Sequence, residues 1–375
     1  MNFSDRLLSI MVMLSNQSNN AKILIGFWSY YEEFCKNNLL FTDPSVGWGE
    51  HPYRRLNRLR EECAKKSIEI LTIDLIDDFS QVDIFLFSDF PRMKNKLVQK
   101  AFAAKKPMFL IIEEPEVVHP DNWKLENHIL FSKIFTNHDG YVDNKKYFKY
   151  NTFCIEPLLM KRSTNVVQKE KLCAAIWSNK RSLHPLELYS KRREIIRWFE
   201  KYHPDDFDLY GYGWDTYSFP HGNKHIARLN SKKLFFLRKR FREFYPSWRG
   251  PVKDIFSVLR RYKFAFAFEN TRDTPGQIQD RIFLAFFSNT VPVYRGASNV
   301  NDHIPSNCFI DLREFATYKD LYDFLVSIND SKYFEYLDNI DKFLNSERSY
   351  QFTSKFFVKV VLDQIEDILQ IKLHP

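Results

Sequence analysis

Glycine and cysteine are scarce in this chain of 375 residues, which holds 10 Gly, 16 Pro and 5 Cys. So few glycines and prolines exclude collagen-like and low-complexity sequences, and no internal repeat of fixed period occurs. The cysteines form no Cys-x-x-Cys pair and no Cys/His spacing of a metal site, which favours buried free thiols in a reducing compartment. They are Cys35, Cys63, Cys154, Cys173 and Cys308.

Long apolar runs are missing as well. No stretch reaches the roughly 20 apolar residues that a membrane-spanning helix needs. The apolar stretch at residues 7–14 is too short, and residues 16–20 follow it without a small-residue cleavage site. We interpret residues 1–20 as a frayed or tag-like lead, and the simplest expectation for the chain is a cytoplasmic protein.

Aromatic residues are abundant, with 36 Phe, 19 Tyr and 7 Trp, and 44% of the chain is hydrophobic. This is enough apolar material for about two domains with full cores. The net charge of +8 is uneven, because residues 178–263 carry 20 Lys and Arg against 9 Asp and Glu. Such a bias favours an anionic partner, which is a nucleotide phosphate, a nucleic acid or a membrane surface, although a solvated basic face gives the same pattern.

Strands alternate with helices along the whole chain, which predicts two α/β units with mostly parallel sheets. In the first half, strands are predicted at 21–28, 68–73, 82–87, 107–112 and 134–136, and helices at 56–66 and from Pro91 through 104. In the second half, strands are predicted at 172–177, 207–210, 263–268, 290–294 and 309–312, and helices at 189–202, 256–261, 280–287, 319–326, 331–344 and 356–371.

The predicted domains are 1–160, 161–350 and a final amphipathic helix, 351–375, that packs back across both. Residues 154–171 are interpreted as the connection between the two units. A cleft between two such units is a natural site for two substrates.

The segment from Tyr262 to Gly296 carries the most information. It predicts a buried strand, a polar loop, a helix that begins at Asp280 and Arg281, and a second strand. Glu269 and Asn270 follow the first strand, where sheets of this class usually hold ligands. An anion can bind at the start of the helix, because free N–H groups and the dipole favour it there. An ordinary βαβ unit with a charged helix start shows the same pattern.

Several motifs in order resemble one family. They are WSNKRS at 177–182 with YSKRREIIRWFEKY after it, LYGYGW at 209–214, YKFAFAFENT at 262–271, QDRIFLAFFSNTVPVYRG at 279–296 and IPSNCFIDLREF at 304–315. This ordered set resembles glycosyltransferase family ten, the α-1,3/1,4-fucosyltransferases, and EEPEVVHPDNW at 113–123 looks like the acidic loop of bacterial members.

The resemblance implies a GT-B fold, which is two Rossmann-like domains facing a cleft. It also implies transfer of L-fucose from GDP-fucose to a hydroxyl of an acceptor glycan, with inversion and with no metal strictly required. The donor would bind the C-terminal domain and the acceptor the N-terminal one. Because the vertebrate end motif and a membrane anchor are absent, we expect α-1,3 transfer to a GlcNAc or Glc-type sugar of a surface glycan such as lipopolysaccharide. The basic stretch and the final helix would bring the enzyme to the inner membrane face.

An inverting transfer needs a base near the acceptor, and the acidic loop offers Glu113, Glu114 and Glu116. These carboxylates follow a predicted buried strand, so at least one is expected to face the cleft. Repulsion within the cluster should raise the pKa of one of them towards a value useful for a base. We prefer Glu114 and place Glu113 next, while a solvated acidic loop remains the alternative.

The donor residues implied by the resemblance are Ser178, Asn179, Arg192, Glu269, Asn270, Gln277, Asp280 and Arg281. Arg281 stands where the family carries Lys, and a guanidinium suits a bidentate grip on phosphate. Asp280 replaces the family's Glu, and Gln277 stands where some members carry Tyr. Surface cations on amphipathic helices are the alternative interpretation of the arginines.

Three other interpretations stay open at this point. The chain could be a GT-B transferase that uses another nucleotide sugar, or a degenerate transferase that binds sugar nucleotides without turnover. It could also be a basic nucleic-acid-binding protein, since residues 232–248 mix positive charge with aromatics. Against the last, the charges fall mostly on predicted helices with ordinary apolar faces, so we expect no nucleic acid as partner.

Overall fold

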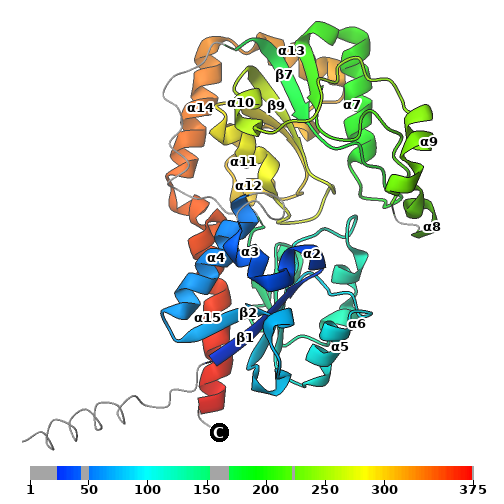
Figure 1. Ribbon diagram of the computed structural model, residues 1–375. Helices are drawn as coiled ribbons and strands as arrows, with labels where there is room; N and C mark the ends of the chain where they lie inside the picture. The colour runs from blue at the N-terminus through cyan, green and yellow to red at the C-terminus, as the bar shows by residue number, and fades with distance from the viewer. Residues whose placement is uncertain (1–22, 44–49, 153–168, 222–223, 374–375) are drawn as a thin grey trace, which may run out of the picture.

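The computed structural model describes residues 23–43, 50–152, 169–221 and 224–373 (Figure 1). Within these ranges the chain forms two sheets in which every neighbouring pair of strands is parallel. Helices connect the strands, as the alternating pattern predicts. The predicted lead at 1–20, and the predicted connection up to residue 168, lie outside the described residues.

The N-terminal sheet has six strands. Their order is β2 (Ile68–Thr72), β1 (Ile23–Ser29), β3 (Ile84–Ser88), β4 (Met108–Ile111), β5 (Lys133–Thr136) and β6 (Tyr147–Lys149). The helices around this sheet are α2 (Glu32–Cys35), α3 (Leu39–Thr42), α4 (Glu50–Ala64), α5 (Lys96–Ala103) and α6 (Leu125–His128). The short strand β6 was not predicted, because three residues are too few for an alternating pattern to register.

The C-terminal sheet has five strands. Their order is β11 (Ile310–Asp311), β10 (Val291–Arg295), β9 (Tyr262–Phe268), β7 (Lys171–Ile176) and β8 (Phe207–Tyr210). The helices of this unit are α7 (Tyr189–Tyr202), α8 (Lys224–Ala227), α9 (Phe235–Arg240), α10 (Ile255–Leu259), α11 (Asp280–Phe287), α12 (Val300–His303), α13 (Tyr318–Ser327) and α14 (Asp330–Leu344). The sequence analysis did not predict α8 and α9.

The last helix, α15 (Ser354–Leu373), leaves the C-terminal unit and runs along the N-terminal one, beside α4 (Figure 1). Its apolar side chains, among them Phe357, Val361 and Ile365, are buried in the same core as the N-terminal sheet. The helix therefore ties the two units together from the end of the chain. No helix of the described residues is both long and apolar enough to cross a bilayer.

A polar interlock joins the two units near the ends of their strands. Oδ2 of Asp139, in the N-terminal unit, lies 2.7 Å from Nε2 of His303 and accepts a hydrogen bond from Nδ2 of Asn299 at 2.8 Å. Its Oδ1 pairs with Nζ of Lys149. Gly276 packs against this carboxylate with a φ of +76°, and a Cβ at that position would collide with Asp139. The interlock therefore fixes how the loops of the two units meet.

Asp139→Asn is expected to lower the free energy of unfolding by about 2 kcal/mol at pH 7, because it removes the charge that His303 and Lys149 face. Burial alone would raise the pKa of Asp139, but hydrogen bonds from His303, Lys149 and Asn299 outweigh it and hold this pKa well below its usual range. The stabilisation is therefore fully present above the ordinary pKa of about 4, and it is lost gradually as pH falls from there towards the lowered pKa of the folded state.

Urea unfolding at pH 7 and at about pH 3 tests this sign. The difference between wild type and Asp139→Asn should be large at pH 7 and shrink in acid. Asp323→Asn, at an exposed pair with Lys319, is the matched control and should leave stability almost unchanged. Equal stability of wild type and Asp139→Asn at pH 7 would contradict the interlock.

Candidate active site

The acidic loop after β4 is shaped by a buried aspartate at the end of β3. Asp89 is 1% exposed, and its Oδ1 accepts the backbone N–H groups of Glu113 and Glu114 at 2.7 and 3.0 Å and Nδ2 of Asn122 at 2.6 Å. Burial and the neighbouring Glu113 and Glu114 raise the pKa of Asp89 well above its usual value. The loop is thus held rigidly at the carboxyl edge of the sheet, which positions the two glutamates.

The side chains of Glu113 and Glu114 have different partners. Glu113 pairs with Nη2 of Arg55 at 2.8 Å and accepts a hydrogen bond from Oγ of Ser88 at 2.7 Å, inside the N-terminal unit. Glu114 accepts a hydrogen bond from the hydroxyl of Tyr31 at 2.8 Å. A neutral donor leaves the Glu114 carboxylate available as a base, whereas Arg55 neutralises Glu113, so the structure favours Glu114 of the two candidates.

The pKa of Glu114 is raised, mainly because the carboxylate is buried, and repulsion from Glu113 adds to this. The cause therefore differs from the expectation, in which repulsion within the cluster was the main one. The hydrogen bond from Tyr31 and the positive charges of Lys180 and Arg281 lower the pKa and oppose the shift. Both cations belong to the C-terminal unit, so Glu114 faces positive charge across the boundary between the units.

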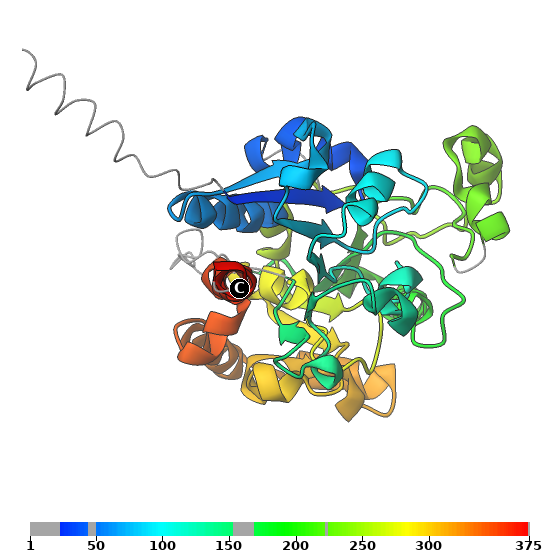
Figure 2. The same ribbon diagram turned by 90° about the horizontal axis from the view of Figure 1, so that it is seen from below.

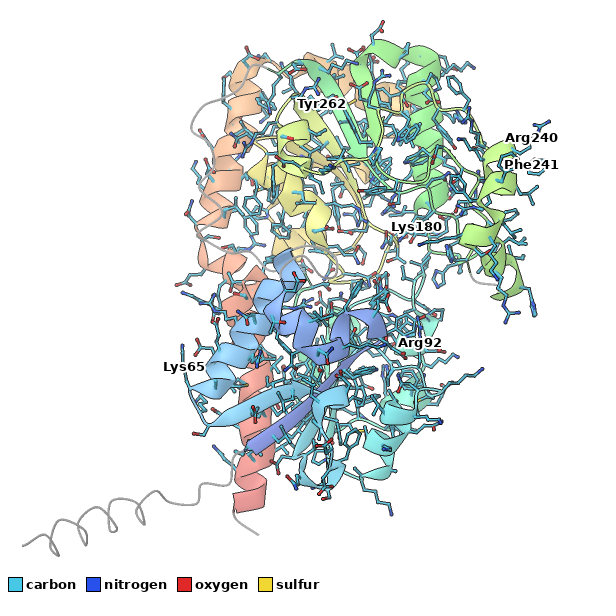
Figure 3. The ribbon with its side chains drawn as sticks, in the orientation of Figure 1. Lys65, Arg92, Lys180, Arg240, Phe241 and Tyr262 are labelled. Atoms are coloured by element: carbon cyan, nitrogen blue, oxygen red, sulfur yellow. The ribbon has the colours of Figure 1, made fainter. Side chains whose placement is uncertain are left out.

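Lys180 lies at this boundary, in the loop after β7 (Figure 3). Although its side chain reaches solvent, the protein around it lowers the pKa of its ammonium by desolvation, and Arg281 and Arg192 lower it further. Attraction to Glu114 opposes this. Lys180 was not predicted as a site residue, although its place directly after Ser178 and Asn179 at a strand end was a usable signal.

Arg192 lies beneath the site instead of lining it. The side chain is 3% exposed, and its Nη2 donates to the carbonyl oxygens of Phe268 and Glu269 at 2.7 and 2.6 Å and to Oδ1 of Asn270 at 3.1 Å. Burial, together with the charge of Arg281, lowers its pKa to about 9. Nη2 of Arg192 therefore holds the end of β9 in place, while its buried Nε has no hydrogen-bond partner among the described residues. A direct contact between Arg192 and phosphate stays a prediction.

Arg281, at the start of α11, is the most accessible cation of the predicted donor residues that meet at the end of β9. Its Nη1 lies 3.2 Å from Oε2 of Glu269 and 3.0 Å from Oε1 of Gln279, and its Nη2 lies 3.3 Å from Oδ1 of Asn270. The guanidinium is 24% exposed, and the carboxylate of Asp280 lies 3.9 Å away. This arrangement leaves a positive charge open to an anion at the helix start.

Glu269 is the buried partner of this cation. It is 1% exposed, and its Oε1 accepts the backbone N–H of Gln279 at 2.8 Å. Burial raises the pKa of Glu269 to about 7, although Arg281 and the N–H of Gln279 oppose the shift. The protonation state of this carboxyl group therefore changes near neutral pH and responds to whatever binds Arg281.

The remaining predicted donor residues shape the loops. Gln277 is 3% exposed and accepts a hydrogen bond from the hydroxyl of Thr271. Nδ2 of Asn179 donates to the carbonyl oxygens of Gly213 and Thr216 at 3.1 and 3.0 Å, which closes the turn after β8. Ser178 lies half-buried after β7.

A cavity of 210 Å³ opens between the two units. Its walls are Glu116, Trp123, His138 and Tyr141 from the N-terminal unit and His184, Leu186, Thr271, Asp273, Thr274 and Gln277 from the C-terminal unit. The ring of Trp123 lies 5.8 Å from that of His138 and 6.1 Å from that of Tyr141, centroid to centroid. Glu116 lies 3.4 Å from His184 across the boundary. The sequence analysis missed this aromatic wall, because its members are brought together only by the fold.

A larger cavity, of 480 Å³, lies beside the ends of β10 and β11. Its cations are already paired: Arg295 with Asp273 at 3.0 Å, Arg313 with Asp311 and Lys191 with Glu194. Each cation of this cavity therefore has a carboxylate partner. In the described part of the chain, no three His, Cys, Asp or Glu side chains gather as metal ligands.

Two facing parallel α/β units define the class, which is the GT-B fold of glycosyltransferases. A crystal structure of an α1,3-fucosyltransferase matches with a TM-score of 0.51 at 12% identity, covering 93% of this chain and 90% of that one. An α-glucosyltransferase in complex with UDP-glucose and DNA containing an abasic site matches with a TM-score of 0.52 at 10% identity, covering 92% and 99%. At such low identity these likenesses establish the fold, which confirms the prediction.

The family follows from the sequence. The model of glycosyltransferase family 10 (fucosyltransferase), C-terminal part, matches residues 166–361, and the chain belongs to this family. An α-(1,4)-fucosyltransferase of Arabidopsis thaliana is 35% identical over 73 residues, which are 20% of this chain and 18% of that protein. The α-(1,3)-fucosyltransferase FucT of Helicobacter pylori is 30% identical over 81 residues, which are 22% and 17%. The chain thus matches less than a fifth of either relative's length.

Proposed function

We propose that this protein is an inverting fucosyltransferase that moves L-fucose from GDP-fucose to a hydroxyl of an acceptor glycan. The observation that carries the proposal is the position of Glu114. Its carboxyl group has a raised pKa on the N-terminal side of the boundary, and it faces Lys180 and Arg281 on the C-terminal side. A base opposite a cluster of cations is the arrangement that an inverting transfer from a nucleotide diphosphate needs.

Each group has a defined part in the proposed step. The acceptor oxygen attacks C1 of fucose from the face opposite GDP, the bond between C1 and the diphosphate oxygen breaks, and the acceptor proton passes to Glu114. Arg281 and Lys180 stabilise the negative charge that develops on the departing diphosphate. Arg192 acts indirectly, because it holds the backbone carbonyls at the end of β9 that set the position of Asn270. No metal is required for these roles.

The cavity at the boundary supports a sugar as acceptor. Aromatic rings such as those of Trp123 and Tyr141 suit the C–H faces of a sugar ring, and Glu116 and His184 offer hydrogen bonds to its hydroxyls. We propose a GlcNAc or Glc-type sugar of a surface glycan, such as lipopolysaccharide, with an α-1,3 linkage. The proposed location is the cytoplasm with peripheral contact at the inner membrane face, which the basic stretch at 178–263 supports.

Titration calorimetry without added metal tests the donor. The protein is titrated with GDP, GDP-fucose, GDP-mannose and UDP-galactose. Binding of GDP and GDP-fucose, with weaker binding of the other two, is the predicted result. Binding of UDP-galactose in preference would mean that Asp280, Arg281 and Gln277, which depart from the family pattern, select another donor. Binding without turnover in an acceptor screen would indicate a degenerate transferase.

GDP binding is expected to be coupled to proton uptake near pH 7. A diphosphate that binds Arg281 draws this cation away from Glu269 and adds negative charge nearby, so the pKa of Glu269, already about 7, rises further. The enthalpy of GDP binding should therefore depend on the ionisation enthalpy of the buffer. Glu269→Gln should abolish this dependence, whereas Glu335→Gln, at an exposed pair with Lys332 on α14, should keep it. A buffer-independent enthalpy for wild type would contradict the coupling.

The raised pKa of Glu269 also makes the stability of the protein depend on pH. Because folding raises the pKa of Glu269, this residue contributes to the free energy of unfolding. The contribution is fully present below the ordinary pKa of about 4.3 and is lost as pH rises through about 7.

A further inference from the structure

Helix α9 and the residues around it form a surface that is both aromatic and basic. We call it the aromatic–basic patch, and it consists of Lys232, Lys233, Phe235, Phe236, Leu237, Lys239, Arg240, Phe241, Arg242 and Phe244. Phe236 is 84% exposed, Phe244 75% and Phe241 60%. Several fully apolar rings gathered on one exposed segment are unusual for a surface that meets only water.

Polar contacts attach this segment to the rest of the C-terminal unit, and its apolar side chains contribute little to that attachment. Nε of Arg238 donates to the carbonyl oxygen of Tyr217 at 2.7 Å, and its Nη1 donates to that of Asn230 at 3.0 Å. The side chain of Asn230 exchanges two hydrogen bonds of 2.9 Å with the backbone of Phe219. The fold therefore orders α9 and leaves its phenylalanines exposed.

The charge along α9 and the segment before it is positive. Residues 216–242 contain eight Lys and Arg and no Asp or Glu. The next carboxylate along the chain, Glu243, is engaged by Arg181 and by the hydroxyl of Tyr245. A surface that presents apolar rings within a positive field complements an anionic surface with an apolar interior, which describes a bilayer with acidic headgroups.

The position of the patch agrees with this partner. Helices α8 and α9 project from the side of the C-terminal unit, with α8 at the level where the two units meet and α9 farther up (Figure 1). A view from below shows this segment standing clear of the rest of the molecule (Figure 2). Arg240 and Phe241 point away from the body (Figure 3). The projection is also joined to the site, since Arg238 binds Thr216, whose carbonyl oxygen accepts from Asn179 beside Lys180.

We propose that the aromatic–basic patch docks this protein on an anionic lipid bilayer, with phenylalanine rings in the headgroup region and Lys and Arg on acidic headgroups. Docking through α9 brings the boundary that holds Glu114 beside the membrane, where a lipid-linked glycan is within reach. The role of docking rests on the proposed function, whereas docking itself rests on the aromatic–basic patch alone. A nucleic acid would also meet positive charge and aromatics, but purely apolar Phe and Leu on a convex projection favour lipid.

Co-sedimentation with vesicles tests the patch. The full chain is mixed with phosphatidylcholine vesicles with or without about 30% phosphatidylglycerol. Wild type should bind only the anionic vesicles, and less at high salt. Phe236→Ser/Phe241→Ser and Lys239→Glu/Arg240→Glu should each weaken binding about tenfold or more. Lys96→Glu/Lys100→Glu on α5, a matched charge reversal, and Phe334→Ser on α14 should bind as wild type does.

Turnover of GDP-fucose with a soluble acceptor, measured on the same variants, separates this inference from the proposed function. Patch variants that keep turnover but lose vesicle binding would support the aromatic–basic patch as the docking surface. Failure of wild type to bind anionic vesicles, or equal losses in the α5 control, would overturn the docking surface while leaving the enzyme intact. Patch-dependent binding of a single-stranded oligonucleotide without vesicle binding would overturn it in favour of nucleic acid. Vesicle binding without any GDP-fucose turnover would overturn only the proposed function.

Discussion

Glu114→Gln is expected to lower the rate of fucose transfer by about a thousandfold, while GDP affinity stays nearly unchanged. The amide keeps the size of the side chain and its place beside Tyr31, but it cannot take the acceptor proton, and a positioned base contributes roughly 10²–10⁴ in rate. The measurement is the turnover of GDP-fucose at saturating acceptor, with GDP affinity measured separately by calorimetry.

The pH dependence adds an independent test of the same residue. Because burial raises the pKa of Glu114, the wild-type rate should fall as pH drops through this raised pKa, since only the ionised carboxylate acts as a base. The residual rate of Glu114→Gln should lack this acid limb.

Two neighbouring acids serve as controls. Glu113→Gln should mainly lower stability, because it removes a carboxylate charge that pairs with Arg55, which is 1% exposed. Asp121→Asn, at an exposed pair with Lys124, should change neither rate nor stability noticeably. A thousandfold loss of rate in Glu113→Gln, with Glu114→Gln active, would contradict our assignment of the base.

Arg281→Ala is expected to lower the rate of transfer by about 10²–10³ and to weaken GDP binding as well. The guanidinium is a partly exposed cation at the start of α11, where a departing diphosphate needs stabilisation. Its removal also leaves the buried Glu269 without this charged partner. The measurement is again the turnover of GDP-fucose, together with calorimetry of GDP.

Arg281→Lys keeps the positive charge, so it separates the effect of losing that charge from any effect on folding. Lysine keeps the positive charge, and the resemblance to the family implies Lys at this position, so this variant should keep the rate within about tenfold of wild type. Arg261→Ala, at an exposed pair with Glu170 before the start of β9, is the control and should behave as wild type. A rate of Arg281→Ala within a few-fold of wild type would contradict the proposed role.

The sequence pattern predicted the fold well where helices and strands are long and their buried residues recur with a regular period. The predicted helices at 189–202 and 280–287 and the strand at 207–210 have the bounds that the structure gives. By contrast, α8 and α9 lie in a basic stretch whose apolar side chains face outward, so they lack the core-facing period that identifies a helix.

The candidate site was predictable only where residues follow a strand directly. Glu114, Glu269 and Arg281 stand at strand ends or at a helix start, and the expected geometry of parallel sheets brings them to one edge. The pairing of Glu113 with Arg55 was not predictable, because it joins residues distant in the sequence through tertiary packing. The buried position of Arg192 was missed for the same reason, since helical spacing gives a face but not the depth at which it packs.

The most direct test of the central claim is a transfer assay with GDP-fucose labelled in the sugar, a panel of GlcNAc- and Glc-containing acceptors and no added metal. We predict a labelled disaccharide or longer glycan whose NMR spectrum shows an α-fucoside, formed with inversion from the β-linked donor, and its loss in Glu114→Gln. A β-fucoside, or turnover of another nucleotide sugar while GDP-fucose stays intact, would contradict the account.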